Sequence, residues 1–135
     1  MVEIVDRQPT DPRPLFLYAS LHVVHEPIEA PVELVKLYTR SQPGWCPKKR
    51  SIAAMASVAD NVTAQVVAAL KRNSMWDNTV LVFSSDNGGD SGCSSNFPLR
   101  GRKRSFFEGG VRKDCDTVPH GRSNPPTPPL TKSIL

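Results

Sequence analysis

Residues 79–89, with the sequence TVLVFSSDNGG, decide the fold class of this 135-residue chain. The first five residues, Thr79 to Phe83, are mostly apolar or β-branched and predict a strand. Because nearly every position is apolar, we expect both faces of this strand to be covered, as they are in parallel sheets. Where the strand ends, Asp86 to Gly89 provide a carboxylate, a carboxamide and two glycines. The stretch therefore combines a buried strand with polar chemistry at its carboxyl end.

The segment before this strand carries the clearest helical pattern in the chain. Apolar residues recur there at steps of three and four: Ile52, Met55, Ala59, Val62, Val66, Ala69 and Leu70. The pattern predicts an amphipathic helix with Ser51 as its N-cap. Lys71 and Arg72 then lie at the negative end of the helix dipole. A second, shorter helix is predicted near residues 31–37.

Residues 14–19, PLFLYA, form a further short apolar run and predict another buried strand. The order strand, long helix, strand predicts an α/β fold. A hydrophobic content of 39% and a charged content of 22% are those of an ordinary globular protein, so one modest domain can form. From residue 113 onward the chain is polar and proline-rich. We therefore expect a folded part at 1–112 and a disordered tail at 113–135.

The length of the apolar runs and the number of cysteines bear on membrane insertion and on the redox compartment. No window approaches the roughly 18 to 20 apolar residues that span a bilayer, so no membrane partner is expected. The polar N-terminus does not have the pattern of a signal peptide. The three cysteines, Cys46, Cys93 and Cys115, form neither a CxxC pair nor an even disulfide set. They leave the redox compartment open.

Asp86 and Asn87 are the candidate metal ligands. In open α/β sheets, ligands collect beyond the carboxyl ends of the strands, which is where these two residues lie. Their side-chain oxygens suit a hard cation such as Ca²⁺ or Mg²⁺ rather than zinc. The alternative is an ordinary turn, because Asp, Asn and Gly favour turns in any loop.

His25 follows the predicted strand at 14–19 and can reach the same edge of the sheet. A histidine there can donate a hydrogen bond to an anion or to a leaving-group oxygen. The alternatives are an exposed loop histidine and an identical role for His22, which the sequence pattern alone does not separate from His25.

Residues 100–104, RGRKR, place four cations around one glycine. One interpretation is anion binding, with Lys103 as a compact charge and the arginines as forked donors. A second is nucleic-acid binding, supported by the neighbouring aromatic residues Phe97, Phe106 and Phe107. A third is a solvated charged loop.

Asn61, Val62 and Thr63 match the acceptor pattern for N-glycosylation. Asn61 lies off the apolar stripe of its predicted helix, so a glycan there can be accommodated. The match has meaning only if the chain enters the secretory pathway.

Three blocks of the sequence, in this order, resemble the arylsulfatases. They are PLFLYAS with HEP, NVTAQVVAALKRNSMWDNTVLVFSSDNGG, and NFPLRGRKRSFFEGGVR. The resemblance runs from about residue 14 to residue 112, and it is greatest to the arylsulfatase B (N-acetylgalactosamine-4-sulfatase) group.

This resemblance implies part of an alkaline-phosphatase-like domain, with a central mixed sheet flanked by helices. It implies Ca²⁺-dependent hydrolysis of sulfate esters, with sulfated glycosaminoglycans as the expected substrates. Asp86 and Asn87 match two metal ligands of the family. His25 matches a histidine that contacts the substrate sulfate, which favours it over His22. Lys103 matches a lysine that binds sulfate and stabilises the leaving oxygen.

The chain also departs from the family pattern. Sulfatases use a formylglycine made from the cysteine of a C-x-P-S-R motif, and this motif is absent here, since Cys46 is followed directly by Pro47. The Asp-Asp pair that supplies the family's earlier metal ligands is absent too. We therefore expect an internal piece of a sulfatase that is inactive by itself.

Several further expectations follow from the resemblance. The full-length family is lysosomal or secreted, and its partner is a sulfate ester rather than nucleic acid. The main alternative function is a non-catalytic binder of sulfated glycans or other polyanions through residues 100–104. A related phosphatase shares the metal chemistry, but the HEP and PLRGRK blocks favour a sulfatase.

Overall fold

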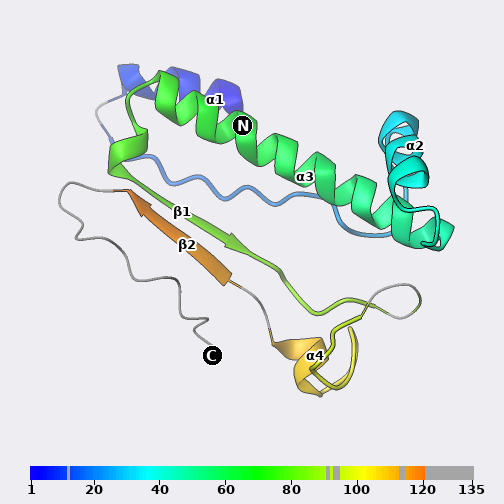
Figure 1. The fold of residues 1–135 in the computed structure, drawn as a ribbon. Coiled ribbons are helices and arrows are strands. Elements are labelled where there is room, and N and C mark those ends of the chain that lie inside the picture. The colour runs from blue at the N-terminus through cyan, green and yellow to red at the C-terminus, as the bar shows by residue number, and fades with distance from the viewer. Residues whose placement is uncertain (12, 91, 93–94, 113–114, 121–135) are drawn as a thin grey trace. The chain divides into compact units, whose positions relative to one another are not determined.

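The structure is a computed structural model that describes residues 1–11, 13–90, 92, 95–112 and 115–120. The chain divides into two compact units, residues 1–76 and 77–135. The first unit contains α1 (Val2–Arg7), the 3-10 helix η1 (Gln8–Thr10), α2 (Val32–Ser41) and α3 (Pro47–Arg72) (Figure 1). The short 3-10 helix η2 (Trp76–Asn78) leads into the second unit, which contains β1 (Thr79–Ser84), α4 (Glu108–Val111) and β2 (Cys115–His120).

Helix α3 is the long amphipathic helix predicted from the apolar repeat, but it begins earlier than expected. Its N-cap is Cys46 rather than Ser51, and the Cys46 Sγ accepts a hydrogen bond from the Lys49 backbone N–H at 3.4 Å. Pro47 occupies the first turn, where its missing N–H costs no hydrogen bond. Lys71 lies with Arg72 in the last turn, as predicted.

The core of the first unit lies along the C-terminal half of α3. Val5 of α1 is fully buried against Val66, Ala69 and Leu70. Partly buried apolar side chains complete this cluster: Val2, Leu15, Leu17, Met75 and Trp76. Helix α1, which was not predicted from the sequence, therefore exists because it covers the apolar stripe of α3.

Helix α2 packs on the other half of α3 and extends beyond the predicted residues 31–37. The Tyr38 hydroxyl lies 2.8 Å from the Ser57 Oγ of α3, within hydrogen-bonding distance. The Tyr38 ring stacks on Trp45, with 6.2 Å between ring centroids and 10° between planes. The Lys49 ammonium lies 4.4 Å from the centroid of the Trp45 ring. These contacts fix the turn between α2 and α3.

The strand predicted at residues 14–19 does not form. The segment alternates as a strand would: Leu15 and Leu17 pack on the core, while Phe16 and Tyr18 are 90% and 80% exposed. Among the described residues of the first unit, no strand offers it a hydrogen-bonding partner. Without such a partner, the alternation alone cannot make a sheet.

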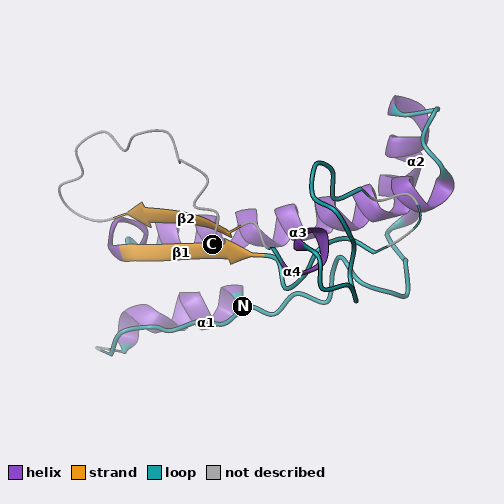
Figure 2. Ribbon diagram, turned by 90° about the horizontal axis from the view of Figure 1, so that it is seen from below, coloured by secondary structure: helices purple, strands orange, loops and turns teal. Residues whose placement is uncertain are grey.

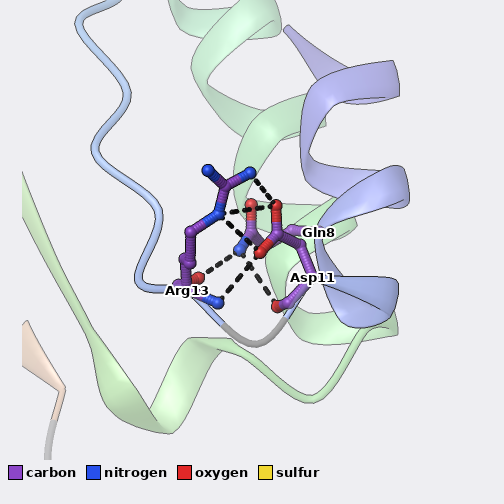
Figure 3. A network of polar contacts seen from close by, with 3 residues as sticks. All are labelled: Gln8, Asp11 and Arg13. Atoms are coloured by element: carbon purple, nitrogen blue, oxygen red, sulfur yellow. Dashed lines mark hydrogen bonds and ion pairs between the residues drawn. The ribbon is translucent and has the colours of Figure 1, made fainter.

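Polar contacts hold the turn after α1 and the end of α3. Asp11 accepts hydrogen bonds from the backbone N–H and the guanidinium of Arg13, and Gln8 Nε2 donates to the Arg13 carbonyl at 2.5 Å (Figure 3). Asp6 of α1 accepts from Arg72 at 2.7 Å and from the Asn73 amide at 2.7 Å. The hydrogen bonds from Asn73, and then those from Arg72, hold the pKa of Asp6 below its usual value.

In the second unit, β1 confirms the strand predicted at 79–83, but its strand pairing and its burial differ from the prediction. It pairs antiparallel with β2, from Thr79 opposite His120 to Ser84 opposite Cys115 (Figure 2). The expectation of a parallel strand covered on both faces is therefore wrong for this chain. Val80 and Val82 are 67% and 59% exposed, because the described residues contain only this two-stranded sheet.

The disordered tail predicted at 113–135 is wrong for residues 115–120, which form β2. The open edge of β1 presents unpaired N–H and C=O groups, and β2 satisfies them. Residues 113–114 and 121–135 lie outside the described residues. The proposed boundary at residue 112 stays a prediction.

Helix α3 also bears on the membrane prediction. By length and composition alone it could cross a bilayer, since an 18-residue window reaches a mean hydropathy of 1.3. The statement that no window approaches a span is therefore wrong. The buried residues of α3 nevertheless pack within the first unit, while Asp60, Asn61 and Gln65 are exposed. We interpret α3 as the core helix of this unit.

Candidate functional site

The candidate metal ligands lie in the loop that follows β1. Asp86 is exposed and Asn87 is half-buried. The Asn87 Nδ2 donates to the Gly88 carbonyl at 3.0 Å, so the amide nitrogen is engaged within the loop. The Asn87 Oδ1 is then the atom that this side chain can offer to a cation. The Ser85 Oγ donates to the Asn87 carbonyl at 2.8 Å and tightens the same turn.

Asn96 ties this loop to the basic segment that follows it. Its Oδ1 accepts a hydrogen bond from the Gly89 N–H at 2.8 Å. Its Nδ2 donates to the Gly89 carbonyl at 3.0 Å and to the Gly101 carbonyl at 3.1 Å. Asn96 was not among the residues predicted from the sequence. The signal that could have found it is an amide side chain placed between two glycine-rich loops, where backbone groups need partners.

Backbone hydrogen bonds join the same loops directly. The Lys103 N–H donates to the Gly89 carbonyl at 3.0 Å, and the Gly88 N–H donates to the Gly110 carbonyl at 3.1 Å. The Gly109 N–H donates to the Arg100 carbonyl at 2.7 Å. We call residues 86–89, 96–105 and 107–111 the glycine-loop cluster. It places the loop of Asp86 and Asn87 beside the loop of Lys103.

Two glycines are required by the close approach of these loops. A Cβ at Gly88 would lie 1.8 Å from the Gly109 carbonyl oxygen, and one at Gly109 would lie 2.6 Å from the Gly101 carbonyl oxygen. Neither position can hold a side chain without moving backbone. Glycine is therefore needed at both positions because only a residue without a Cβ lets these backbone segments approach so closely.

The basic segment presents its cations in different environments. Lys103 is half-buried, whereas Arg102 and Arg104 are exposed. The Arg100 guanidinium lies 4.1 Å from the centroid of the Phe107 ring, a cation–π contact. Arg112 is within 3.9 Å of the Glu108 carboxylate. Lys103 is thus the one cation among residues 100–104 that is half-buried rather than exposed.

His25 lies in the first unit, apart in the chain from the glycine-loop cluster. Its Nδ1 is 2.8 Å from the Glu26 carbonyl oxygen. Since a carbonyl only accepts, the Nδ1 carries the proton, and the Nε2 can donate a hydrogen bond only when the ring is an imidazolium. The His22 ring is 6.1 Å away, centroid to centroid. The two histidines therefore lie close together, and this geometry does not show which of them contacts the sulfate.

Asp86 and Asn87 fit part of a calcium site. Both offer hard oxygen donors, and Asp86 accepts no hydrogen bond from the described residues. Calcium takes about six to eight oxygen ligands, however, so two side chains supply a minority of them. Within the described ranges, no three His, Cys, Asp or Glu side chains gather into a further metal cluster.

The sequence profile described as Sulfatase matches residues 1–115. The chain belongs to the sulfatase family. Arylsulfatase J of Mus musculus is 42% identical over 101 residues, which cover 74% of this chain and 16% of that protein. A sulfatase of Formosa agariphila is 34% identical over 119 residues, covering 81% of this chain and 21% of that protein. N-acetylgalactosamine-6-sulfatase of Canis lupus familiaris is 26% identical over 131 residues, covering 90% and 23%.

A solved structure supports the same assignment. The crystal structure of Ps i-CgsB in complex with k-i-k-neocarrahexaose matches with a TM-score of 0.80 and 33% identity. The match covers 92% of this chain and 29% of that one. The predicted class, a partial alkaline-phosphatase-like sulfatase domain, is therefore confirmed. The chain spans between a sixth and a quarter of the length of the curated relatives named above.

Proposed function

We propose that this chain is part of a calcium-dependent sulfatase that hydrolyses sulfate esters. Asp86 and Asn87 act as two of its calcium ligands, and Lys103 contacts the sulfate. The observation that carries the proposal is the glycine-loop cluster, in which the Lys103 N–H donates to the Gly89 carbonyl, two residues after Asn87. Calcium ligands and a sulfate-binding cation are expected to lie close together when both act on the same anion.

The proposed roles follow from the charge of the reaction. When the S–O bond of a sulfate ester breaks, negative charge moves onto the bridging oxygen. The Lys103 ammonium is suited to stabilise that charge because it is a compact cation with three donors. His25 is proposed to contact the sulfate as well, on the basis of the family resemblance of the HEP block. A bound calcium ion supplies further positive charge beside the sulfate.

The isolated chain is expected to bind without turnover. A sulfatase needs the formylglycine nucleophile, and the sequence contains no C-x-P-S-R motif. Cys46 does not replace it, because it is disulfide-bonded and caps α3. The chemical step therefore belongs to a protein that also supplies the nucleophile and the remaining calcium ligands.

Within the family, we place this chain near the arylsulfatase B group, with sulfated glycosaminoglycans as its substrates. The support for this placement is the HEP and PLRGRK blocks of the sequence. The matching structure of Ps i-CgsB contains a bound oligosaccharide. This is consistent with a glycan substrate rather than a small aryl sulfate.

The proposed compartment is the lysosome or the extracellular space. The disulfide at Cys46 supports it, because disulfides persist in oxidising compartments and are rare in the cytosol.

Calcium titration of the full chain tests the ligand assignment. We expect weak binding by calorimetry, abolished by Asp86→Ala and by Asn87→Ala. Asp60→Ala is the matched control, since Asp60 is an exposed aspartate on α3. Micromolar affinity that survives Asp86→Ala would contradict the assignment. Hydrolysis of an aryl sulfate by sequence-verified chain would contradict the expectation of inactivity.

A second candidate function is a non-catalytic binder of sulfated glycans. The observation that favours it is the exposure of Arg102 and Arg104 beside Phe106, whose side chain is fully exposed. Salt-sensitive binding to chondroitin sulfate, weakened by the pair Arg102→Ala and Arg104→Ala but not by Arg40→Ala, would support it. Equal binding to DNA would reduce the interaction to general electrostatics.

A further inference from the structure

The one asparagine–glycine pair of the sequence lies within the glycine-loop cluster. Asn87 directly precedes Gly88. The other asparagines precede residues larger than glycine: Asn61, Asn73, Asn78, Asn96 and Asn124. Because glycine has no Cβ, its backbone nitrogen can approach the preceding side chain with little steric hindrance. Among all the asparagines, Asn87 therefore has the chain neighbour best suited to attack its side-chain amide.

The Asn87 side chain lies against the Gly88 residue in the folded loop. Its Nδ2 donates a hydrogen bond to the Gly88 carbonyl at 3.0 Å. Both residues are half-buried rather than buried, and Asp86 before them is exposed, so water can reach the pair. The amide and the backbone nitrogen that could react with it are thus neighbours in one solvated turn.

The fold nevertheless occupies the Gly88 nitrogen. The Gly88 N–H donates to the Gly110 carbonyl at 3.1 Å. A nitrogen that keeps its proton in such a hydrogen bond is a poor nucleophile. The backbone at Gly88 is also closely packed, since a Cβ there would overlap the Gly109 carbonyl oxygen. Attack on the Asn87 side chain therefore requires Gly88 to separate from residues 109–110.

We propose that Asn87 is a deamidation site, which the hydrogen bond between Gly88 and Gly110 keeps unreactive until the glycine-loop cluster opens. In the opened cluster, the Gly88 nitrogen loses its proton and attacks the Asn87 Cγ. An N–Cγ bond forms, the Cγ–Nδ2 bond breaks, and ammonia leaves with the proton. Water then opens the succinimide ring at either of its carbonyls and leaves aspartate or isoaspartate at position 87. Water is the co-reactant, and no oxidant or reductant is needed.

Both products change the loop. Aspartate places a second carboxylate directly after Asp86, whereas isoaspartate adds one methylene group to the backbone path before Gly88. The longer path shifts Gly88 relative to Gly110, and it shifts Gly89 relative to Asn96. Formation of isoaspartate thus makes the opening of the cluster permanent. The consequence for cation binding rests on the proposed function, but the modification itself does not.

Asn73 provides an internal comparison within the same chain. It is followed by Ser74, the smallest residue that follows any of the other asparagines. The Asn73 Nδ2 donates to Asp6 at 2.7 Å and to the Ala69 carbonyl at 2.9 Å, at the end of α3. Since Ser74 carries a Cβ, Asn73 should react more slowly than Asn87 even in the unfolded chain.

The test is incubation of the full chain at neutral pH in water enriched in heavy oxygen, followed by peptide mapping with mass spectrometry. We expect labelled aspartate and isoaspartate at position 87, with isoaspartate identified by methyl transfer from an isoaspartate methyltransferase. Conversion should be at least about tenfold faster in guanidinium chloride that unfolds the chain, because the cluster is then fully open.

A pair of variants tests the role of the cluster without denaturant. Asn96→Ala should accelerate conversion at position 87, since the hydrogen bonds from Asn96 to Gly89 are lost. Asn78→Ala is the matched control and should leave the rate unchanged, because no hydrogen bond in the described structure involves the Asn78 side chain.

Two outcomes would overturn the proposal. Equal conversion rates with and without denaturant would show that the folded cluster does not protect Asn87. Conversion of Asn73 before Asn87 in the unfolded chain would show that the pair of Asn87 and Gly88 is not the reactive one. Neither measurement uses calcium or a sulfate ester, so failure here leaves the proposed function standing. A loss of calcium binding by Asp86→Ala, in turn, says nothing about deamidation.

Discussion

Asn96 forms hydrogen bonds with both backbone groups of Gly89, accepting from its N–H at 2.8 Å and donating to its carbonyl at 3.0 Å. This pairing imitates the ladder of a β-sheet with a single side chain. The same amide nitrogen reaches the Gly101 carbonyl at 3.1 Å. This carboxamide and the backbone hydrogen bond from Lys103 N–H to the Gly89 carbonyl together hold the loop of Asp86 beside the loop of Lys103.

Replacement of Asn96 by alanine is predicted to loosen both loops. Each lost hydrogen bond should cost about 0.5–1.5 kcal/mol of unfolding free energy. Hydrogen exchange should accelerate at the Gly89 and Lys103 amides, and calcium binding should weaken, although Asn96 is not proposed as a ligand. Asn78→Ala is the control, since no hydrogen bond in the described structure involves its side chain. Unchanged exchange at Gly89 in Asn96→Ala would show that the clamp is not needed.

Gly88→Ala is predicted to disrupt the glycine-loop cluster more strongly. The added Cβ would lie 1.8 Å from the Gly109 carbonyl oxygen, so backbone must move. Overpacking of this kind costs roughly 1–3 kcal/mol, measurable as a lower urea midpoint. Gly44→Ala is the matched control, because a Cβ there meets nothing within 4 Å. Equal urea midpoints for the two variants would contradict the close approach of Gly88 and Gly109.

α3 and β1 could be predicted from local patterns in the sequence. The apolar repeat that indicates α3 lies within that helix, and the β-branched run that indicates β1 lies within that strand. Contacts between distant residues produced the rest. β2 was missed because its support comes from β1, more than thirty residues earlier in the chain. Asn96 was missed because its role depends on Gly89 and Gly101 together. Strand formation at residues 14–19 was predicted from a short apolar run and failed, since the described residues of its unit offer no pairing strand.

In the candidate site, too, the sequence motifs indicated individual residues, whereas the contacts between loops were visible only in the structure. Asp86, Asn87, Lys103 and His25 were selected from motifs and from a family resemblance. The structure adds that hydrogen bonds at Gly89 join the loop of Asp86 and Asn87 to the loop of Lys103. Their roles stay predictions, because a motif gives the residue types and not the complete set of ligands.

Lys103→Ala is predicted to weaken binding of a sulfated ligand more than Arg104→Ala does. Lys103 is half-buried in the glycine-loop cluster, whereas Arg104 is exposed. A hydrogen bond to a charged group contributes roughly 1.5–3 kcal/mol, which corresponds to about a ten- to hundredfold change in affinity. Titration with a sulfated N-acetylgalactosamine at constant salt measures this. If the two variants weaken binding equally, general electrostatics explains it and Lys103 has no special role.

Acid is predicted to loosen the contact between α1 and the end of α3. Hydrogen bonds from Asn73 and then Arg72 lower the pKa of Asp6 from 3.8, so its carboxylate is favoured in the folded chain. A group with a depressed folded pKa stabilises the fold above its unfolded pKa, and this contribution is lost as the pH falls through the folded value. The stabilisation should therefore be complete at pH 7, begin to fall near pH 3.8, and be lost once the pH is below the lowered pKa of folded Asp6.

Asp6→Asn tests this through the pH dependence of thermal unfolding. The variant should unfold at a lower temperature than the wild type near neutral pH, because the charged acceptor for Arg72 is gone. The difference should shrink as the pH falls below 3.8 and through the lowered pKa of folded Asp6, where the wild-type carboxyl also loses its charge. Asp60→Asn is the control, since Asp60 is exposed on α3 and forms no ion pair in the described structure. A difference that stays constant from neutral pH to pH 3 would mean that the Asp6 charge does not stabilise the first unit.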